Sequence, residues 1–257
     1  MAKKCIVIGN WKMHPSSGKE AIKWFKSLAK LVTKIRQTEV VVCPPVVYLD
    51  NLKKVRTSKI KLGAQDLFFG DVGPNTGAIS GAMLEDMGIK YSILGHSERR
   101  ALGESDELIN KKIKSALAFG ITPILCVGEK DRDPAHNYFE VVKNQIGDCL
   151  RGISKDSLSR VMIAYEPIWS ISSTENRKDA TPGDIHEMSL FVRKVLSDLA
   201  TGTVASKMHI LYGGSVNSKD ALDFYKQGEV DGLLVGKSSL DPVKFFEIIQ
   251  ICETSNK

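Results

Sequence analysis

The sequence has 257 residues, and its 36 Lys and Arg against 30 Asp and Glu give a formal net charge of +6. Its 42% hydrophobic and 26% charged residues are typical of a globular protein and exclude a disordered, collagen-like or low-complexity chain. A chain of this size buries about three-quarters of its unfolded surface, so it can form a core without disulfides or a structural metal.

Membrane, secretory and nucleic-acid-binding proteins are also poor matches. The longest stretch without a charged residue, 115–128, is too short to cross a bilayer, and the first residues lack the apolar run of a signal peptide. The positive charges are spread along the chain, so we expect no nucleic-acid and no membrane partner. The cysteines are odd in number and contain no C-x-x-C pair, which favours free thiols in a reducing cytoplasm: Cys5, Cys43, Cys126, Cys149 and Cys252.

Eight short apolar runs recur along the chain, and they predict buried strands because they are continuously apolar and do not alternate. In chain order they cover 5–9, 40–43, 60–64, 91–94, 121–127, 161–164, 208–211 and 232–235. Segments with helical periodicity lie between them, as in 21–35, 113–117, 185–199 and 243–251. Thr181 and Asp241 each precede a proline, a pattern typical of a helix start.

Alternating strands and helices indicate parallel strands joined by right-handed crossovers. A doubly wound sheet and a closed barrel both fit this pattern, and the near-equal units favour a closed eight-stranded parallel (β/α)8 barrel of the α/β class. No linker or shift in composition divides the sequence, so residues 1–257 are predicted to form one barrel domain. In such folds ligands bind at the carboxyl ends of the strands.

Polar and ionisable side chains come directly after several predicted strands. Asn10 and Lys12 follow the first strand, His96 and Glu98 the fourth, and Glu166 the sixth. Each alone could be an ordinary loop residue, but their convergence on one rim of a barrel indicates an enzyme. The apolar neighbours of Glu166 would desolvate its carboxylate, which makes it a better general base.

Two glycine-containing turns after the last two strands predict a phosphate site. Gly214 and Ser215 follow the seventh strand, and Gly236 and Lys237 follow the eighth. Barrels bind phosphate with the backbone N–H groups of such turns and a helix N-terminus. The histidines lack the spacing of zinc ligands, so no metal is expected.

Taken together, these motifs resemble the triosephosphate isomerase family over essentially the whole sequence. The matching segments are 9–12, 94–100, 164–169, 212–216 and 231–236. The resemblance implies the TIM barrel fold and interconversion of dihydroxyacetone phosphate and glyceraldehyde 3-phosphate through an enediolate. It also implies a place in glycolysis and gluconeogenesis, with a phosphorylated triose as substrate and neither cofactor nor metal.

By this resemblance the catalytic residues would be Glu166 as the base, His96 as the neutral electrophile and Lys12 as the cation. Asn10 would orient the substrate carbonyl, and Glu98 would support Lys12 and His96. The phosphate would be bound by backbone groups, which the family pattern places at Gly214, Ser215, Gly236, Lys237 and Ser172.

The segment after Trp169 departs from the usual family pattern. It is about three residues longer, and both of the family's lid glycines are missing, with Ser172 at the phosphate-binding one. Serine disfavours the positive φ and close backbone approach that glycine permits. Lys237 likewise replaces a usual glycine of the last phosphate turn.

The resemblance implies a homodimer, and two positions that serve its contact are atypical. His14 stands where the family usually has Asn, and Ala78 where it has a Glu that pairs with the arginine matching Arg99. We therefore expect a homodimer that is weaker than usual.

Two alternatives to an active isomerase stay open at this point. One is a phosphate-binding barrel whose isomerase activity is impaired or lost because of the altered lid. The other is a barrel enzyme that keeps the phosphate site but performs different chemistry on a phosphorylated sugar, which the joint presence of Lys12, His96 and Glu166 disfavours.

Overall fold

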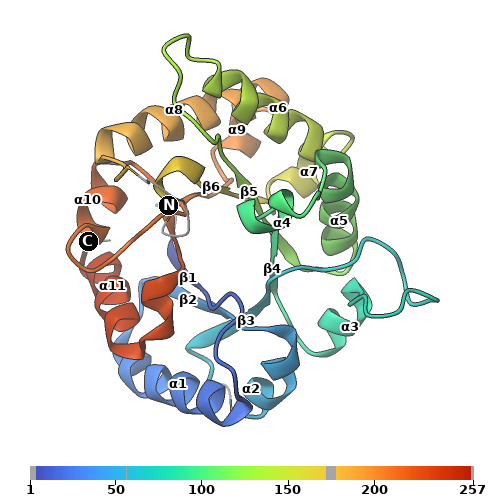
Figure 1. The fold of residues 1–257 in the computed structure, drawn as a ribbon, viewed down its shortest axis with the longest axis vertical. Coiled ribbons are helices and arrows are strands. Elements are labelled where there is room, and N and C mark those ends of the chain that lie inside the picture. The colour runs from blue at the N-terminus through green and yellow to red at the C-terminus, as the bar shows by residue number, and fades with distance from the viewer. Residues whose placement is uncertain (1–3, 56, 172–177, 256–257) are drawn as a thin grey trace.

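The computed structural model describes residues 4–55, 57–171 and 178–255. Over these residues eight parallel strands form a closed barrel, with helices around its outside (Figure 1). The strands are β1 (Cys5–Asn10), β2 (Thr38–Cys43), β3 (Ile60–Ala64), β4 (Tyr91–Leu94), β5 (Thr122–Val127), β6 (Met162–Tyr165), β7 (Ile210–Tyr212) and β8 (Gly232–Val235). The predicted (β/α)8 barrel is confirmed.

Each strand pairs with the next one along the chain, and β1 closes the barrel against β8 with Ile6 opposite Gly232. The predicted strands lie within two residues of the observed ones. The seventh strand differs most from its prediction, which was 208–211. The observed β7 begins two residues later, at Ile210, and ends one residue later, at Tyr212.

The helices follow the strands in turn. Their bounds are α1 (Gly18–Leu31), α2 (Leu49–Val55), α3 (Gly81–Asp86), α4 (Ser97–Ala101), α5 (Asp106–Ala118), α6 (Tyr138–Leu150), α7 (Lys155–Leu158), α8 (Pro182–Leu199), α9 (Gly202–Ala205), α10 (Ala221–Lys226) and α11 (Pro242–Ser255). The start of α8 has the predicted cap: Thr181 accepts the Asp184 N–H and Asp184 accepts the Thr181 N–H in return.

The core has two layers, which explains why the strands are continuously apolar. Along β1, Ile6 and Ile8 belong to a cluster inside the barrel, whereas Cys5 and Val7 belong to the larger cluster between strands and helices. Successive side chains of a strand point to opposite faces, so every strand residue must be apolar where both faces are covered.

The segment after β3 stands apart from this layout. Residues 65–80 project from the barrel beside α3 as a long loop (Figure 1).

All five cysteines are buried and free. In the part of the chain that the structure describes, no helix combines the length and apolar character needed to cross a membrane.

Candidate active site

A cavity of about 370 Å³ opens at the carboxyl ends of the strands. All the predicted site residues line it except Glu98, which borders a neighbouring cavity, and Ser172, which lies outside the described residues. The lining residues are Asn10, Lys12, His96, Glu166, Ile171, Gly213, Gly214, Ser215, Val216, Asn217, Leu234, Gly236, Lys237 and Ser238. The cavity therefore gathers residues that follow β1, β4, β6, β7 and β8.

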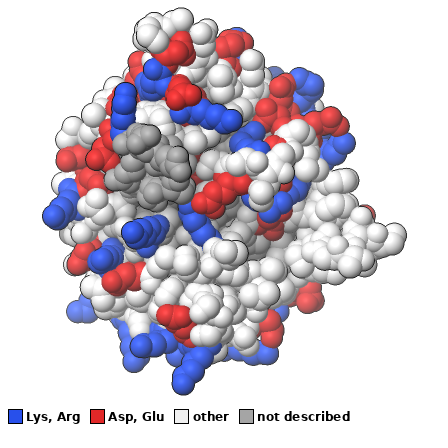
Figure 2. Space-filling model, viewed as in Figure 1, with Lys and Arg blue, Asp and Glu red and all other residues white. Residues whose placement is uncertain are grey.

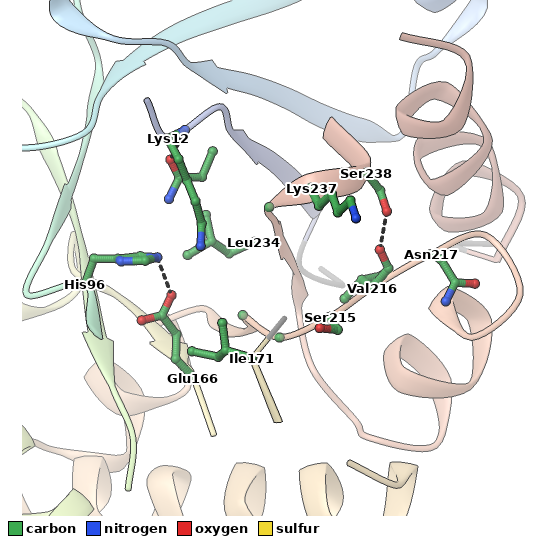
Figure 3. A pocket seen from close by; sticks show the side chains of 14 residues that line it. Lys12, His96, Glu166, Ile171, Ser215, Val216, Asn217, Leu234, Lys237 and Ser238 are labelled. Carbon is green, nitrogen blue, oxygen red and sulfur yellow. Dashed lines mark hydrogen bonds and ion pairs between the residues drawn. The ribbon is translucent and has the colours of Figure 1, made fainter. Parts of the chain in front are cut away.

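Glu166 lies one residue beyond β6 and is only 3% exposed. Its Oε2 accepts a hydrogen bond from the Ser97 N–H at 3.1 Å, and its Oε1 lies 3.2 Å from Nε2 of His96 (Figure 3). The Glu166 N–H donates to the carbonyl of Val127 on β5, which ties its backbone to the barrel. The carboxylate is thus largely shielded from water and held at the cavity wall, as a general base requires.

His96 is the residue that caps the start of α4, and it is 6% exposed. Its Nδ1 accepts the backbone N–H of Glu98 at 3.2 Å. A ring nitrogen that accepts a hydrogen bond carries no proton, so the ring is neutral with its proton on Nε2. That Nε2–H points at Glu166 and the cavity, where it can donate to an oxygen of a ligand (Figure 3).

The turn before His96 depends on a glycine. Gly95 has φ +69°, and a Cβ there would lie 2.8 Å from Cδ1 of Ile109 on α5. Only glycine adopts this backbone conformation without strain while packing so closely against a helix. Arg100 fixes the same turn, because its Nε donates to the Gly95 carbonyl at 2.7 Å.

Lys12 has a left-handed backbone conformation, with φ 50°. Its N–H donates to Oδ1 of Asn10 at 3.0 Å, and its carbonyl accepts from Nε2 of Gln65 at 2.8 Å. These bonds on both sides hold a conformation that is costly for a non-glycine residue, a pattern often found at functional sites. The ammonium of Lys12 forms an ion pair with Glu98 at 2.5 Å.

The glycine-containing turns lie at the other end of the cavity, away from His96 (Figure 3). The turns after β7 and β8 are joined by Ser238, whose hydroxyl donates to the Val216 carbonyl at 2.6 Å. The hydroxyl of Ser215 donates to the Ser170 carbonyl. Lys237 is exposed at the rim, and among the residues that the structure describes no ion pair involves its ammonium.

Sequence reasoning missed two polar residues that support this site. Gln65 follows β3 and Glu129 follows β5, so both obey the strand-end rule that pointed to the other residues. Gln65 holds Lys12, as described above. The Glu129 carboxylate accepts hydrogen bonds from Tyr165 and Trp169, the residues on either side of 166–168.

Comparison with known proteins agrees with this geometry. The model of the family described as Triosephosphate isomerase matches residues 5–252. The chain belongs to the triosephosphate isomerase family. It is 42% identical over 247 residues to the triosephosphate isomerase of Roseiflexus sp. (strain RS-1), covering 95% of this chain and 96% of the relative. For the enzyme of Thermoanaerobacter pseudethanolicus the identity is 43%, with 95% and 98% covered, and for that of Dictyoglomus thermophilum it is 39%, with 95% and 98% covered.

Ala78, one of the positions expected to contact the partner in a dimer, lies beside a second cavity of about 570 Å³. Ala78 lines this cavity, together with Arg99, Phe68 and Phe69. Arg99 forms its ion pairs within the chain, with Asp66 at 2.7 Å and Glu104 at 3.2 Å. The side chain of Ala78 cannot form an ion pair with Arg99. The Arg99 guanidinium is paired instead with these two carboxylates.

Proposed function

We propose that this chain interconverts dihydroxyacetone phosphate and glyceraldehyde 3-phosphate, with Glu166 carrying the proton between the two carbons. The arrangement that carries the proposal is the buried pair of Glu166 and neutral His96 at 3.2 Å, with Lys12 on the same cavity. Membership of the triosephosphate isomerase family supports the same reaction. The relatives described above are all named triosephosphate isomerase, which gives no support to a barrel with lost activity.

In the forward direction Glu166 removes a proton from C1 of dihydroxyacetone phosphate. The C–H electron pair forms the C1–C2 double bond, and the C2 carbonyl electrons move onto its oxygen. The Nε2–H of His96 and the ammonium of Lys12 stabilise that developing negative charge, which a preorganised donor does most strongly in a site shielded from water.

The second half reverses these roles. Protonated Glu166 returns its proton to C2, while the hydroxyl proton on the C1 oxygen is transferred by way of His96 to the C2 oxygen. C1 becomes an aldehyde and C2 an alcohol, so oxidation and reduction balance within the substrate. The reaction needs no external electron acceptor, and we propose that it proceeds without cofactor or metal.

The remaining predicted residues have supporting roles in this proposal. The Oδ1 of Asn10 is engaged by the Lys12 N–H, so its Nδ2 is the atom available to orient the substrate carbonyl. Glu98 holds the ammonium of Lys12 and presents its own N–H to His96. At the opposite end the phosphate would be bound by backbone N–H groups of the turns at Gly214, Ser215, Gly236 and Lys237. Ser172 lies outside the described residues, and its role in phosphate binding stays a prediction from the sequence.

We further propose a homodimer, formed through the second cavity and the projecting residues 65–80. Large apolar side chains are exposed there: Val72 on the projection is 70% exposed, and Phe69 and Val46, which line the cavity, are 41% and 43% exposed. Figure 2 draws the projection as almost uncharged, whereas both signs of charge are interspersed over the rest of this face. A two-fold contact would place the projection of one copy in the cavity of the other.

The atypical contact residues support a weaker homodimer than usual. Ala78 has no side-chain acceptor for Arg99, and Arg99 is paired within its own chain. Light scattering over a range of micromolar concentrations tests this proposal: we expect dimers that dissociate on dilution, and only monomers throughout would contradict it. We also propose that residues 1–257 act as one barrel domain in the cytoplasm, in glycolysis and gluconeogenesis.

A coupled assay on glyceraldehyde 3-phosphate tests the proposed reaction, with Glu166→Gln as the variant. Loss of the base should lower kcat by about 10²- to 10⁴-fold, the usual contribution of general-base catalysis. Glu140→Gln on the exposed face of α6 is the matched control and should behave like the parent. A Glu166→Gln variant as active as the parent would exclude this mechanism, and an inactive parent that still binds inorganic phosphate would favour a binding protein.

A further inference from the structure

A buried carboxylate, Glu129, lies directly behind the site and takes no part in the chemistry proposed above. It is 1% exposed and follows β5 by two residues. Its Oε1 accepts hydrogen bonds from Tyr165 at 2.8 Å, from Trp169 at 2.8 Å and from Nε of Arg132 at 3.1 Å. Glu129 thus joins residues from the ends of two neighbouring strands.

Arg132 connects this carboxylate to a third element. Its Nη1 forms an ion pair with Glu187 on α8, and its Nη2 donates to the hydroxyl of Tyr165 at 3.2 Å and to the Asp184 carbonyl at 3.4 Å. Its guanidinium also lies 5.7 Å from the ring centre of Trp169. The rigid, planar fork of arginine can make all these contacts at once, which a lysine cannot do.

These contacts lie on both sides of the connection between β6 and α8. Tyr165 and Trp169 come at its beginning, and Asp184 and Glu187 lie in the first turns of the helix that ends it. The backbone agrees with this arrangement, because the Lys178 N–H donates to the Trp169 carbonyl at 3.1 Å. Arg132 therefore spans the two ends of the connection that begins with Glu166.

The electrostatics of the group favour a permanently charged Arg132. Burial alone would lower its pKa, but the hydrogen bonds and charges of Tyr165, Glu187 and Glu129 outweigh burial and raise it. Burial and the charge of Glu129 also raise the pKa of Tyr165. The protonated phenol, which donates to Glu129, is therefore favoured.

Tyr165 is the residue before Glu166, so a displacement of the Tyr165 backbone also moves the base. Two backbone hydrogen bonds also tie this segment to the end of β5. The Glu166 N–H donates to the Val127 carbonyl, and the Ile168 N–H donates to the Glu129 carbonyl at 3.0 Å. Proton transfer is sensitive to such shifts, since a misplacement of about 1 Å can cost a hundredfold in rate.

We propose that Arg132 is a positioning residue for proton transfer: it holds Tyr165, Trp169 and Glu129 against the start of α8 and so fixes the Glu166 carboxylate relative to His96. The inference rests on the proposed function, because it concerns the placement of the proposed base. It assigns no contact between Arg132 and the substrate.

The test compares Arg132→Met with Arg132→Lys and with the control Arg151→Met. Arg151 is exposed and forms its ion pair with Asp148 at the end of α6, so the control also removes one arginine and one ion pair. We expect Arg132→Met to lower kcat by about tenfold to a hundredfold, with a smaller change in KM. Arg132→Lys should recover only part of that loss, and Arg151→Met should match the parent.

Glu187→Gln provides a second route if Arg132→Met does not fold. It removes the charge that α8 contributes and keeps Arg132 in place. We expect a several-fold lower kcat, and in the double variant the two losses should not multiply, because residues of one network are not additive. Losses that multiply fully would overturn the proposal.

Two readouts separate positioning from general stability. The melting temperature of each variant shows whether the substitution has destabilised the fold. In a further variant, Arg132→Ala, millimolar guanidinium should restore part of the lost kcat by occupying the space that the arginine leaves. Parental kcat in a folded Arg132→Met variant would overturn the inference while leaving the reaction intact. A parent without isomerase activity would instead contradict the proposed function.

Discussion

The Nε2 atom of His96 lies 3.2 Å from Oε1 of Glu166, so the proposed electrophile and the proposed base face one another directly. Because Nδ1 of His96 accepts the Glu98 N–H, the Nε2–H is the one N–H that the ring can donate. In the proposed mechanism, a substrate oxygen that accepts this N–H takes the place of the carboxylate. The carboxylate is then released from His96 and becomes available to a C–H bond of the substrate.

The first prediction concerns the protonation of His96. Because Nδ1 accepts a backbone N–H, ¹⁵N NMR at neutral pH should find the ring neutral, with its proton on Nε2. Replacement by Gln, which keeps a donor but not the ring, should lower kcat by about a hundredfold or more, as for other donors to a developing oxyanion. A doubly protonated ring, or one protonated on Nδ1, would contradict this assignment.

The second prediction uses a glycine to move Glu166 without changing its chemistry. A Cβ added at Gly213 would lie 2.9 Å from Cγ of Glu166 and 3.4 Å from the Tyr165 carbonyl. Gly213→Ala should therefore displace the carboxylate and lower kcat by about tenfold or more. Gly147→Ala on α6 is the control, since nothing lies within 4 Å of its added Cβ. The control should keep its activity and gain up to about 1 kcal/mol of stability.

The sequence allowed the barrel to be predicted because its strands are buried on both faces. Their continuous apolar runs end close to where pairing ends, as at Tyr91–Leu94 in β4. Helix starts could also be predicted where a capping residue precedes a proline, as at Thr181. Where ligands bind then follows from the rule for parallel strands, which is why Lys12, His96 and Glu166 could be singled out.

The strand-end rule also covers Glu129, but it does not indicate which residues Glu129 and its neighbour Arg132 contact. Glu129 and Arg132 acquire their partners from Tyr165, Trp169 and Glu187, which lie more than thirty residues further along the sequence. A loop carboxylate and a loop arginine look alike in sequence whether they are solvated or buried together. Only the three-dimensional approach of β5, β6 and α8 distinguishes the two cases.

The third prediction concerns Lys237 at the proposed phosphate end. Its exposed ammonium adds a charge near a dianionic substrate, and charge contacts at exposed sites contribute up to about 1 kcal/mol. Lys237→Gln should therefore raise KM by about twofold to fivefold with little change in kcat. The difference should shrink at high salt, because exposed charges are screened. Lys244→Gln, an exposed lysine on α11, is the control; an equal effect there would indicate general steering by net charge.

The last prediction concerns stability and its dependence on pH. Glu253 on α11 accepts the backbone N–H groups of Arg36 at 2.6 Å, Gln37 at 2.9 Å and Thr38 at 2.7 Å, so it fastens the last helix to the start of β2. Burial alone would raise the pKa of this carboxyl, but these hydrogen bonds outweigh burial and lower it below the ordinary value of 4.5. The charged form is thus favoured by folding.

A lowered folded pKa means that the stabilisation by Glu253 is fully present above pH 4.5 and is lost as the pH falls through the folded value. Glu253→Gln should lower the free energy of unfolding at pH 7 by about 1–2 kcal/mol, since hydrogen bonds to a charged acceptor are at stake. At a pH below the folded pKa of Glu253, the unfolding free energies of the parent and of Glu253→Gln should become equal. Urea unfolding at pH 7 and in acid measures these free energies. The control is Glu247→Gln, at an exposed position on the same helix. A difference that is unchanged in acid would assign the effect to packing of the side chain and not to its charge.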